Sequence, residues 1–314
     1  MRCFGKRYTW KLDGDKVRFF IDGKDGSERR TDKYFKYYAL DHNSVDALTH
    51  QYLYATHPCQ LNDPLDCAED IIKFDDIETA RIFLDIFVSK VSEMYENDET
   101  SINEFAHVAF RTFYYMKSGI FSLTKKDNDI SLWSYYTFHK GFCVEFDINT
   151  FPFDYWGPFP INYQKELKQV SLKKASLPIA SLIQTNIKPD CWKNEQEWRL
   201  LIQCPDDYYL EPFGFKTELI KSNIPDIHER KFNYPMCCIK SICLGLKFFN
   251  DERFIISGSE GEYVSDDKLQ NVVLAFLAKS GIPTYVMENY GLSLSRCPIE
   301  IIQLGDTKYS IKYL

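Results

Sequence analysis

The sequence predicts an α+β fold in which one or more mixed or mainly antiparallel central sheets are flanked by helices. Three observations predict it. Two strand-like runs separated by a short turn lie near the N-terminus, residues 77–117 repeat apolar side chains at helical spacing, and further strand-like runs return after residue 117 between shorter helical runs. With 314 residues, 45% of them hydrophobic and 26% charged, the chain has the composition of a globular protein with a large core.

The N-terminal segment is predicted to be a β-hairpin. Tyr8–Leu12 and Val17–Ile21 are its strands, and Asp13-Gly14-Asp15 forms the turn between them. A second turn is expected over residues 22–26. Residues 34–40 then form an aromatic strand, residues 44–50 one or two helical turns capped by Asn43 or Ser44, and residues 51–56 a further strand.

The middle of the chain is predicted to be mainly helical. Phe83, Ile86, Phe87 and Val91 recur at three- and four-residue spacing, and residues 102–116 repeat this trend. Shorter helices are expected over residues 130–137, over 166–187 with an interruption near Pro178, and over 268–279 with Gly281 as the C-cap. The remaining strands are expected over residues 120–124, 142–147, 198–203, 239–246, 284–288 and 300–303.

Neither an internal repeat nor a low-complexity linker interrupts the chain. We therefore expect one α+β domain over residues 1–314, with an N-terminal hairpin over about 1–32 and a helical insertion over about 77–117. The formal charge of −7 argues against a protein that coats nucleic acid by neutralising many phosphates. It leaves room for one local basic patch.

The cysteines and the N-terminus predict a cytoplasmic protein without a membrane partner. The ten cysteines form no CxxC pair and no Cys/His zinc spacing, so buried free thiols in a reducing compartment are expected. The N-terminal residues are polar and contain no apolar signal core. No run approaches the roughly 20 apolar residues needed to cross a bilayer.

Glu195, Glu197 and Arg199 form the most informative cluster of polar residues. On a strand these three side chains would share one face, while Trp198, Leu200 and Ile202 would face the core. Such a charged face is expected to meet water, a partner or a ligand. A carboxylate pair of this kind can bind a sugar hydroxyl and stabilise an oxocarbenium-like centre. The alternative is a structural Glu–Arg ion pair at the mouth of a sheet.

A second group combines hydroxyls with aromatic rings. Ser122 and Thr124 would share one face of a strand, and Trp133 and Tyr136 would share one face of a helix. This combination suits a ribose with an attached ring, and it equally suits an ordinary core.

Lys36 and Tyr37, on an early strand, could contact a phosphate or stack on a base. More often such strand residues are half-buried. Asn62, Asp63 and Asp66 form an acidic turn, which needs no metal to explain it, and no metal site is expected. No phosphate-binding glycine loop and no local catalytic triad is present, and His139 is a lone loop histidine.

These segments together resemble the bacterial domain-of-unknown-function family 2971, in family order from about Lys36 to Gly245. The matching pieces are Lys36-Tyr37, residues 61–67, 121–124, 132–136, 139–147, 192–202 and 239–245. More distantly, the chain resembles ADP-ribosyltransferases, which place an Arg or His on an early strand, a Ser-x-Ser/Thr element in the middle and a catalytic Glu late. Lys36-Tyr37, Ser122-Leu-Thr124 and Glu195-Gln-Glu197 follow that order, with Lys36-Tyr37 replacing the usual Arg or His.

The second resemblance implies an ADP-ribosyltransferase-like fold and NAD as a substrate, without a metal. Glu197 would bind the nicotinamide ribose and stabilise its developing cation, and Glu195 would orient the acceptor. Ser122 and Thr124 would support the nicotinamide side. The other expected NAD-binding residues are Lys36, Tyr37, Trp133, Tyr136 and Arg199, and the expected substrate-binding residues are Asn62 and Asp63.

The function that follows is an NAD-dependent ADP-ribosyltransferase modifying a macromolecule, as a toxin or antiviral-defence effector. The acceptor would be a protein or a nucleic acid, and a partner protein of the same system is a further expectation. The aromatic richness and the lack of a complete local motif support an alternative, a non-catalytic recognition module of a bacterial defence or regulatory system. A third hypothesis is a metal-dependent hydrolase or nuclease using the acidic turn of Asn62, Asp63 and Asp66 with Glu145 or Glu197.

Overall fold

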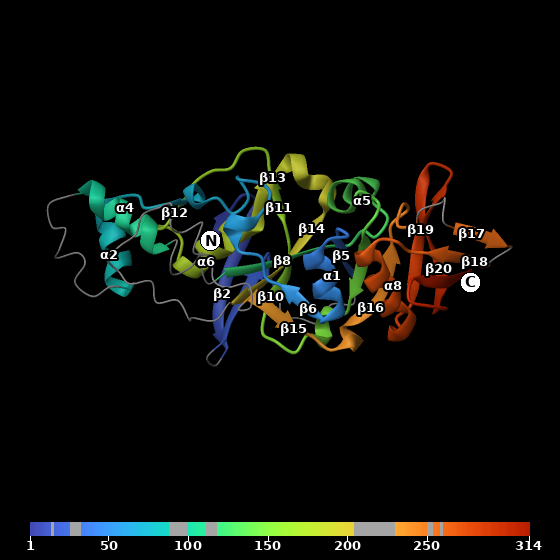
Figure 1. Cartoon of the computed structure of the whole chain (residues 1–314). Helices are drawn as coiled ribbons and strands as arrows, with labels where there is room; N and C mark the ends of the chain where they lie inside the picture. Colours follow the sequence, from blue (N-terminus) through green and yellow to red (C-terminus); the bar gives the residue numbers. More distant parts are fainter. Residues whose placement is uncertain are drawn as a thin grey trace. The chain divides into compact units, whose positions relative to one another are not determined.

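The computed structural model describes residues 1–13, 16–25, 33–87, 99–110, 118–203, 230–249, 254–257 and 260–314 (Figure 1). It is mixed α+β with mainly antiparallel strands, as the sequence predicts. The chain packs into two compact units, each built from three separate stretches. Unit 1 contains Met1–Glu28, Tyr54–Ser122 and Asp154–Lys231, and unit 2 contains Arg29–Leu53, Leu123–Phe153 and Phe232–Leu314. The expectation of a single domain with an insertion stays a prediction.

The predicted hairpin is present at the start of unit 1. β2 (Lys6–Asp13) and β3 (Lys16–Ile21) pair antiparallel, with Tyr8 opposite Ile21. The two-residue strands β1 (Arg2–Cys3) and β4 (Lys24–Asp25) extend it to a four-stranded sheet. Tyr8, Phe19 and Ile21 are buried, so one face of the hairpin contributes to the core of unit 1.

The predicted helical segment over residues 77–117 contains two helices, α2 (Ile77–Phe87) and α4 (Glu99–Phe110). Asp76 caps α2, because its carboxylate accepts a hydrogen bond from the Thr79 amide at 2.8 Å. Phe83 of α2 and Ile102 of α4 lie in the same buried cluster, as the helical spacing predicts. Residues 88–98 and 111–117 of the prediction lie outside the described residues.

The helix predicted over residues 166–187 is shorter than expected. Only α6 (Leu177–Asn186) is helical, and β12 (Val170–Ser171) precedes it, pairing in parallel with β7 (Ile72–Lys73). The predicted interruption at Pro178 is wrong. Proline is tolerated in the first helical turn, where an amide would have no intrahelical partner, so it marks the beginning of α6.

The strands that carry the candidate site lie in unit 1. β14 (Glu197–Gln203) pairs antiparallel with β10 (Trp156–Pro160), with Arg199 opposite Phe159, and it also neighbours β8 (Ser118–Thr124), which belongs to unit 1 as far as Ser122. Separately, β11 (Asn162–Gln164) pairs in parallel with β13 (Ile187–Pro189). This pairing sets Tyr163 opposite Lys188.

Unit 2 is built on a large, mainly antiparallel sheet. Only β16 and β19 pair in parallel among its described strand pairs. Its strands, in spatial order, are β5 (Tyr34–Tyr38), β9 (Phe142–Phe146), β16 (Ile239–Leu244), β19 (Thr284–Tyr290), β20 (Ser293–Gln303), β21 (Lys308–Tyr313), β18 (Glu260–Val264) and β17 (Phe254–Ser257). The sequence did not predict β17, β18 or β21. The small strands β6 (Tyr52–Tyr54) and β15 (Lys231–Asn233) form a separate pair.

The helices of unit 2 are α1 (His42–Thr49), α5 (Ile130–Thr137) and α8 (Lys268–Ser280). Helix α5 has the predicted bounds, and α8 ends at Gly281 in the left-handed conformation that was expected of a C-cap. The prediction of Asn43 or Ser44 as the cap of α1 is wrong. Asp41 caps it instead, accepting a hydrogen bond from the Ser44 amide at 2.8 Å.

Candidate functional site

Glu195 and Glu197 lie on either side of a sharp backbone turn. A 3₁₀ helix (Asp190–Glu195) ends at Glu195, Gln196 is left-handed with φ of 46°, and β14 begins at Glu197. The expected alternation along one strand therefore holds for Glu197 and Arg199 but not for Glu195. Glu195 nevertheless reaches the same cluster, because the turn at Gln196 redirects the chain.

The two carboxylates meet at the ammonium group of Lys188. Its Nζ lies 2.7 Å from Oε2 of Glu195 and 3.0 Å from Oε2 of Glu197, and 3.7 Å from Oδ2 of Asp66. Lys188 lies two residues after the end of α6 and is held in β13 by the pairing with β11. No sequence pattern singled out Lys188, since a lysine beside a proline usually lies on the surface.

Arg199 connects Glu197 to Asp66. Its Nε donates to Oε1 of Glu197 at 2.7 Å, and its Nη1 donates to Oδ1 of Asp66 at 2.9 Å. Nη2 contacts both carboxylates, and Nη1 also donates to the Thr185 carbonyl at 3.0 Å. Asp66, which the sequence placed in an acidic turn, is thus a direct partner of Arg199, and the guanidinium holds two carboxylates in a fixed geometry.

This cluster, which we call the Lys188 cluster, is buried. It consists of three carboxylates and two cations with one net negative charge: Asp66, Lys188, Glu195, Glu197 and Arg199, whose residues are 3%, 3%, 8%, 6% and 1% exposed. The sequence left water, a partner, a ligand or a structural Glu–Arg ion pair open for the charged face of β14, and the buried Glu197–Arg199 pair agrees with the last of these. Leu200 and Ile202 are buried on the opposite face of the strand, so β14 is covered on both sides.

The electrostatics of the cluster keep Glu197 ionised. Burial alone raises the pKa of its carboxyl, but the Arg199 guanidinium and the Lys188 ammonium outweigh burial and hold the pKa at about 2. A hydrogen bond from Ser122 contributes to this lowering of the Glu197 pKa. Burial lowers the pKa of Lys188, and the neighbouring Glu197 and Glu195 outweigh that effect, so the net shift is upward. In these surroundings Lys188 therefore carries its positive charge at neutral pH.

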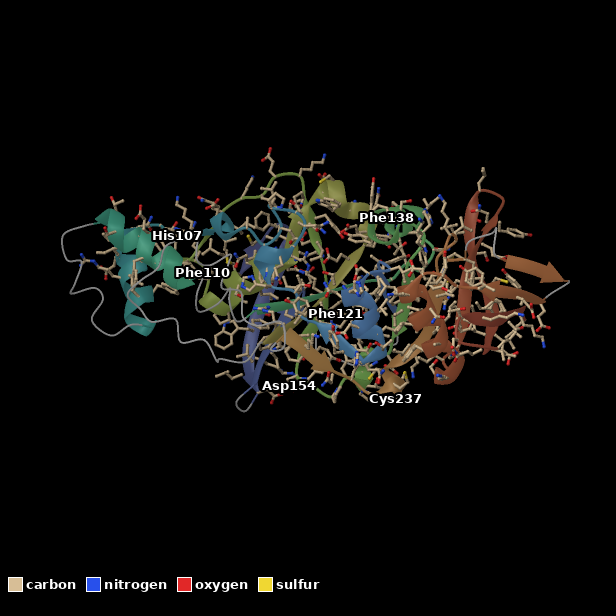
Figure 2. All side chains as sticks on the ribbon, in the orientation of Figure 1. His107, Phe110, Phe121, Phe138, Asp154 and Cys237 are labelled. Atoms are coloured by element: carbon tan, nitrogen blue, oxygen red, sulfur yellow. The ribbon has the colours of Figure 1, made fainter. Side chains whose placement is uncertain are left out.

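The other predicted residues of unit 1 lie on β8, where Ser122 bonds Glu197, and in the loop that ends at Asp66. Ser122 directly follows Phe121, which is fully buried in β8 (Figure 2). Asp63 is buried, and its Oδ1 accepts a hydrogen bond from the Leu65 amide at 2.9 Å, whereas Asn62 is exposed. The loop therefore has the self-bonded geometry expected of an Asn-Asp-Pro turn, and it ends at Asp66 in the cluster.

The remaining predicted residues belong to unit 2. Trp133 is fully buried, its ring meets Tyr37 edge-on at 5.0 Å, and its Nε1 donates to the Asp127 carbonyl at 2.9 Å. The Thr124 hydroxyl accepts a hydrogen bond from the Lys126 amide, and Lys36 lies over the ring of Tyr38. Trp133, Tyr37 and Thr124 have the contacts of a packed core, the alternative that the sequence left open. Tyr136 is half-buried on α5, and exposed Phe138 follows that helix (Figure 2).

A second polar cluster, in unit 2, joins side chains from β9, β16 and β20. Oγ of Ser241 donates to Oε2 of Glu145 at 2.6 Å, and the Arg296 guanidinium donates to Ser241 at 2.6 Å and to Asp127 at 3.0 Å. The guanidinium also lies 4.1 Å above the ring of Tyr285. Sequence reasoning named Glu145 as a hydrolase residue but missed Arg296 and Ser241. Their positions 151 and 96 residues from Glu145 left no local signal.

Unit 1 also contains a largely apolar cavity of about 470 Å³. It is lined by Asp76, Glu78, Thr79, Ile82, Phe83, Leu172, Lys173, Ala175 and Ser176. None of these was predicted as a site residue. Among the described residues, no helix is both long and apolar enough to cross a membrane, and no group of three His, Cys, Asp or Glu side chains has the geometry of a metal site.

Comparisons of the chain with protein-family models, with curated proteins and with solved structures found no match.

Proposed function

We propose that the chain is an NAD-dependent ADP-ribosyltransferase with an ADP-ribosyltransferase-like fold, in which Glu197 stabilises the cation that develops on the nicotinamide ribose. One observation carries the proposal. The Ser122 hydroxyl donates a hydrogen bond to the Glu197 carboxylate. The middle element of the transferase-like order, which begins at Ser122, therefore meets the late element at its proposed catalytic residue, Glu197. Glu197 also has the charge that this role needs, because its pKa of about 2 keeps it ionised at neutral pH.

In this reaction the bond between the ribose C1′ and the nicotinamide nitrogen breaks. The electron pair leaves with nicotinamide, which becomes neutral, and positive charge develops on the ribose. Glu197 stabilises that charge electrostatically, as carboxylates do in glycosidic cleavage. A nucleophile of the acceptor, a protein or a nucleic acid, then bonds to C1′ and loses its proton. Glu195 orients that nucleophile.

The first test is release of nicotinamide from NAD in bacterial lysate by the wild-type protein and by Glu197→Gln. The variant is expected to fold, because two carboxylates then balance the two cations of the Lys188 cluster. Circular dichroism checks the fold, and Lys173→Gln, which changes a charge on the surface of unit 1, serves as a matched control. Release that persists in a folded Glu197→Gln variant would refute the role of Glu197.

Burial of the cluster supports a second candidate function, a non-catalytic recognition module with a structural ion network. All five groups are buried and bonded to one another, an arrangement that needs no substrate. This candidate predicts that NAD stays intact with the wild-type protein in every lysate, and that Glu197→Gln changes stability alone. Transfer of label from radiolabelled NAD to a protein or nucleic acid would exclude it. The same experiment would identify the acceptor on which a toxin or defence effector acts.

A further inference from the structure

The Lys188 ammonium occupies the space between the two carboxylates that the proposed function uses. It bonds Oε2 of both Glu195 and Glu197 and lies near a third carboxylate, Asp66. A substrate cation beside Glu197 would lie next to the Lys188 ammonium, and two positive charges within about 4 Å repel each other. The substrate cation and the ammonium therefore compete for this position.

Aromatic side chains complete the surroundings of the ammonium. Nζ of Lys188 lies 5.1 Å from the centre of the Trp192 ring, within the range of a cation–π contact. Trp192 is half-buried, whereas Lys188 is only 3% exposed. Tyr163 lies opposite Lys188 in the β11–β13 pair, and its hydroxyl accepts a hydrogen bond from the Glu197 amide at 2.8 Å. Carboxylates and aromatic rings together are the surroundings that bind organic cations.

We propose that Lys188 is a built-in blocking cation, and that the space it fills is a binding site for a planar organic cation. This inference rests on the proposed function, in which Glu197 acts on the ribose of NAD; the planar cation is the nicotinamide ring bonded to that ribose before the bond breaks. The resting protein is thus autoinhibited. Ligand binding displaces the Lys188 ammonium, and Trp192 then covers the ring of the ligand.

Lys188, and not Arg199, is the cation that can leave. Arg199 is fixed by hydrogen bonds to Glu197, Asp66 and the Thr185 carbonyl, and it lies within a strand that has a neighbour on each side. The hydrogen bonds of the Lys188 ammonium go to the carboxylates of Glu195 and Glu197, and Lys188 lies in a three-residue strand with one partner. Its four-carbon side chain can reorient, whereas the guanidinium fork cannot do so without breaking several bonds.

Charge balance explains why the site stays closed without a ligand. The cluster carries one net negative charge with Lys188 in place and two when Lys188 leaves. Buried carboxylates tolerate such an excess poorly. A ligand carrying one positive charge restores the original balance, so exchange of one cation for another is the low-cost way to open the site.

The test measures binding of 1-methylnicotinamide, a planar cation with the charged ring of NAD, by isothermal titration calorimetry. The variant is Lys188→Met/Glu195→Gln, which removes the blocking cation and one carboxylate and so keeps the cluster at its wild-type charge. We expect it to bind the probe at least tenfold more tightly than the wild type does. The matched control, Glu195→Gln alone, keeps Lys188 and is expected to bind no better than the wild type. Equal affinity of the double variant and the wild type would overturn the proposal.

A second measurement uses the unaltered protein and therefore does not depend on the folding of a variant. Acetylation of lysines by an amine-reactive ester is followed by mass spectrometry with and without saturating 1-methylnicotinamide. Labelling of Lys188 is expected to rise at least fivefold with the probe, while labelling of Lys173, whose side chain is 66% exposed, stays constant. Unchanged labelling of Lys188 would contradict displacement. Neither measurement needs turnover of NAD, so failure of the transferase assay and failure of the blocking model are separate results.

Discussion

Replacement of Arg199 by methionine is expected to destabilise unit 1 by about 3–5 kcal/mol at neutral pH, the range for removing one partner of a buried ion pair. Methionine keeps much of the length and apolar volume of the side chain, so the loss comes from charge and hydrogen bonding. Asp66, Glu195 and Glu197 would then face the single ammonium of Lys188.

The contacts of the guanidinium set this magnitude. Arg199 donates to Glu197, to Asp66 and to the Thr185 carbonyl, all in buried surroundings. Arg199→Lys keeps the positive charge but cannot serve both carboxylates with a planar fork. The free energy of unfolding of Arg199→Lys is expected to be about 1.5–3 kcal/mol lower than that of the wild type, the range for hydrogen bonds to charged groups. We expect the free energy of unfolding to fall from the wild type to Arg199→Lys and again to Arg199→Met. The first step measures the effect of hydrogen-bond geometry, and the second measures the effect of charge.

The pH dependence gives an independent check. The pKa of Glu197 falls from its ordinary value of 4.5 to about 2 in the folded protein. The unfolded state therefore binds the proton more readily than the folded state. The contribution of ionised Glu197 to the free energy of unfolding is complete above about pH 5 and is lost as the pH falls towards 2. The difference between the two pKa values corresponds to roughly 3 kcal/mol of this free energy. Arg199→Met removes the main cause of the low pKa, so this loss of stability in acid should shrink.

The assay is urea unfolding followed by far-UV circular dichroism at a series of pH values between 7 and 3. An Arg199→Met variant within 1 kcal/mol of the wild type at pH 7 would refute the view that Arg199 holds the cluster together. An unchanged loss of stability in acid would refute the assignment of the low pKa of Glu197 to Arg199.

Two further predictions concern unit 2. A Cβ atom on Gly245 would lie 2.2 Å from the His139 carbonyl oxygen, so Gly245→Ala should cost more than about 3 kcal/mol in thermal or urea unfolding. Gly281→Ala is the control, because Gly281 has φ of 69° and a Cβ atom there would have nothing within 4 Å; this variant should lose about 1 kcal/mol of stability. Equal losses of stability in the two variants would contradict the close approach of the His139 carbonyl to Gly245. Trp133→Phe should cost about 1–3 kcal/mol, because the Asp127 carbonyl loses its donor and the core loses volume. A Trp133→Phe variant as stable as the wild type would show that this ring is not a core residue.

The elements that the sequence predicted well are those with strong periodicity or strong turn chemistry. Helix α5 has the predicted bounds, and the hairpin of β2 and β3 lies where Asp13-Gly14-Asp15 indicated. Less was predictable where local signals competed. Polar residues 166–176 were included in a helix, although only residues from Leu177 are helical, because Pro178 was interpreted as an interruption when it marks a beginning. Strand β21 was missed since its Tyr309–Ile311 segment is buried without alternation.

The candidate site was predicted in part. Glu197, Arg199, Glu195 and Asp66 were all singled out, but Asp66 was connected only with Glu197, in the hydrolase hypothesis, and not with Arg199. Its contact with Arg199 spans 133 residues, and no pattern in a single sequence encodes that contact. Lys188 was missed altogether, because its burial results from the pairing of β13 with β11 and from the carboxylates that surround it.

The alternation of charged and apolar residues along β14 has two structural solutions, and the sequence alone does not distinguish them. In an antiparallel sheet the charged face commonly meets water, and the sequence left this solution open beside a partner, a ligand or a structural ion pair. A charged face can also be covered if the covering segments bring complementary charge. In unit 1 they do so, since the loop ending at Asp66 and the segment from Lys188 to Glu195 supply two carboxylates and one cation. Because these segments leave one net negative charge, the covered face is complementary to a cation, and the binding and labelling experiments decide whether a planar organic cation can take the place of Lys188.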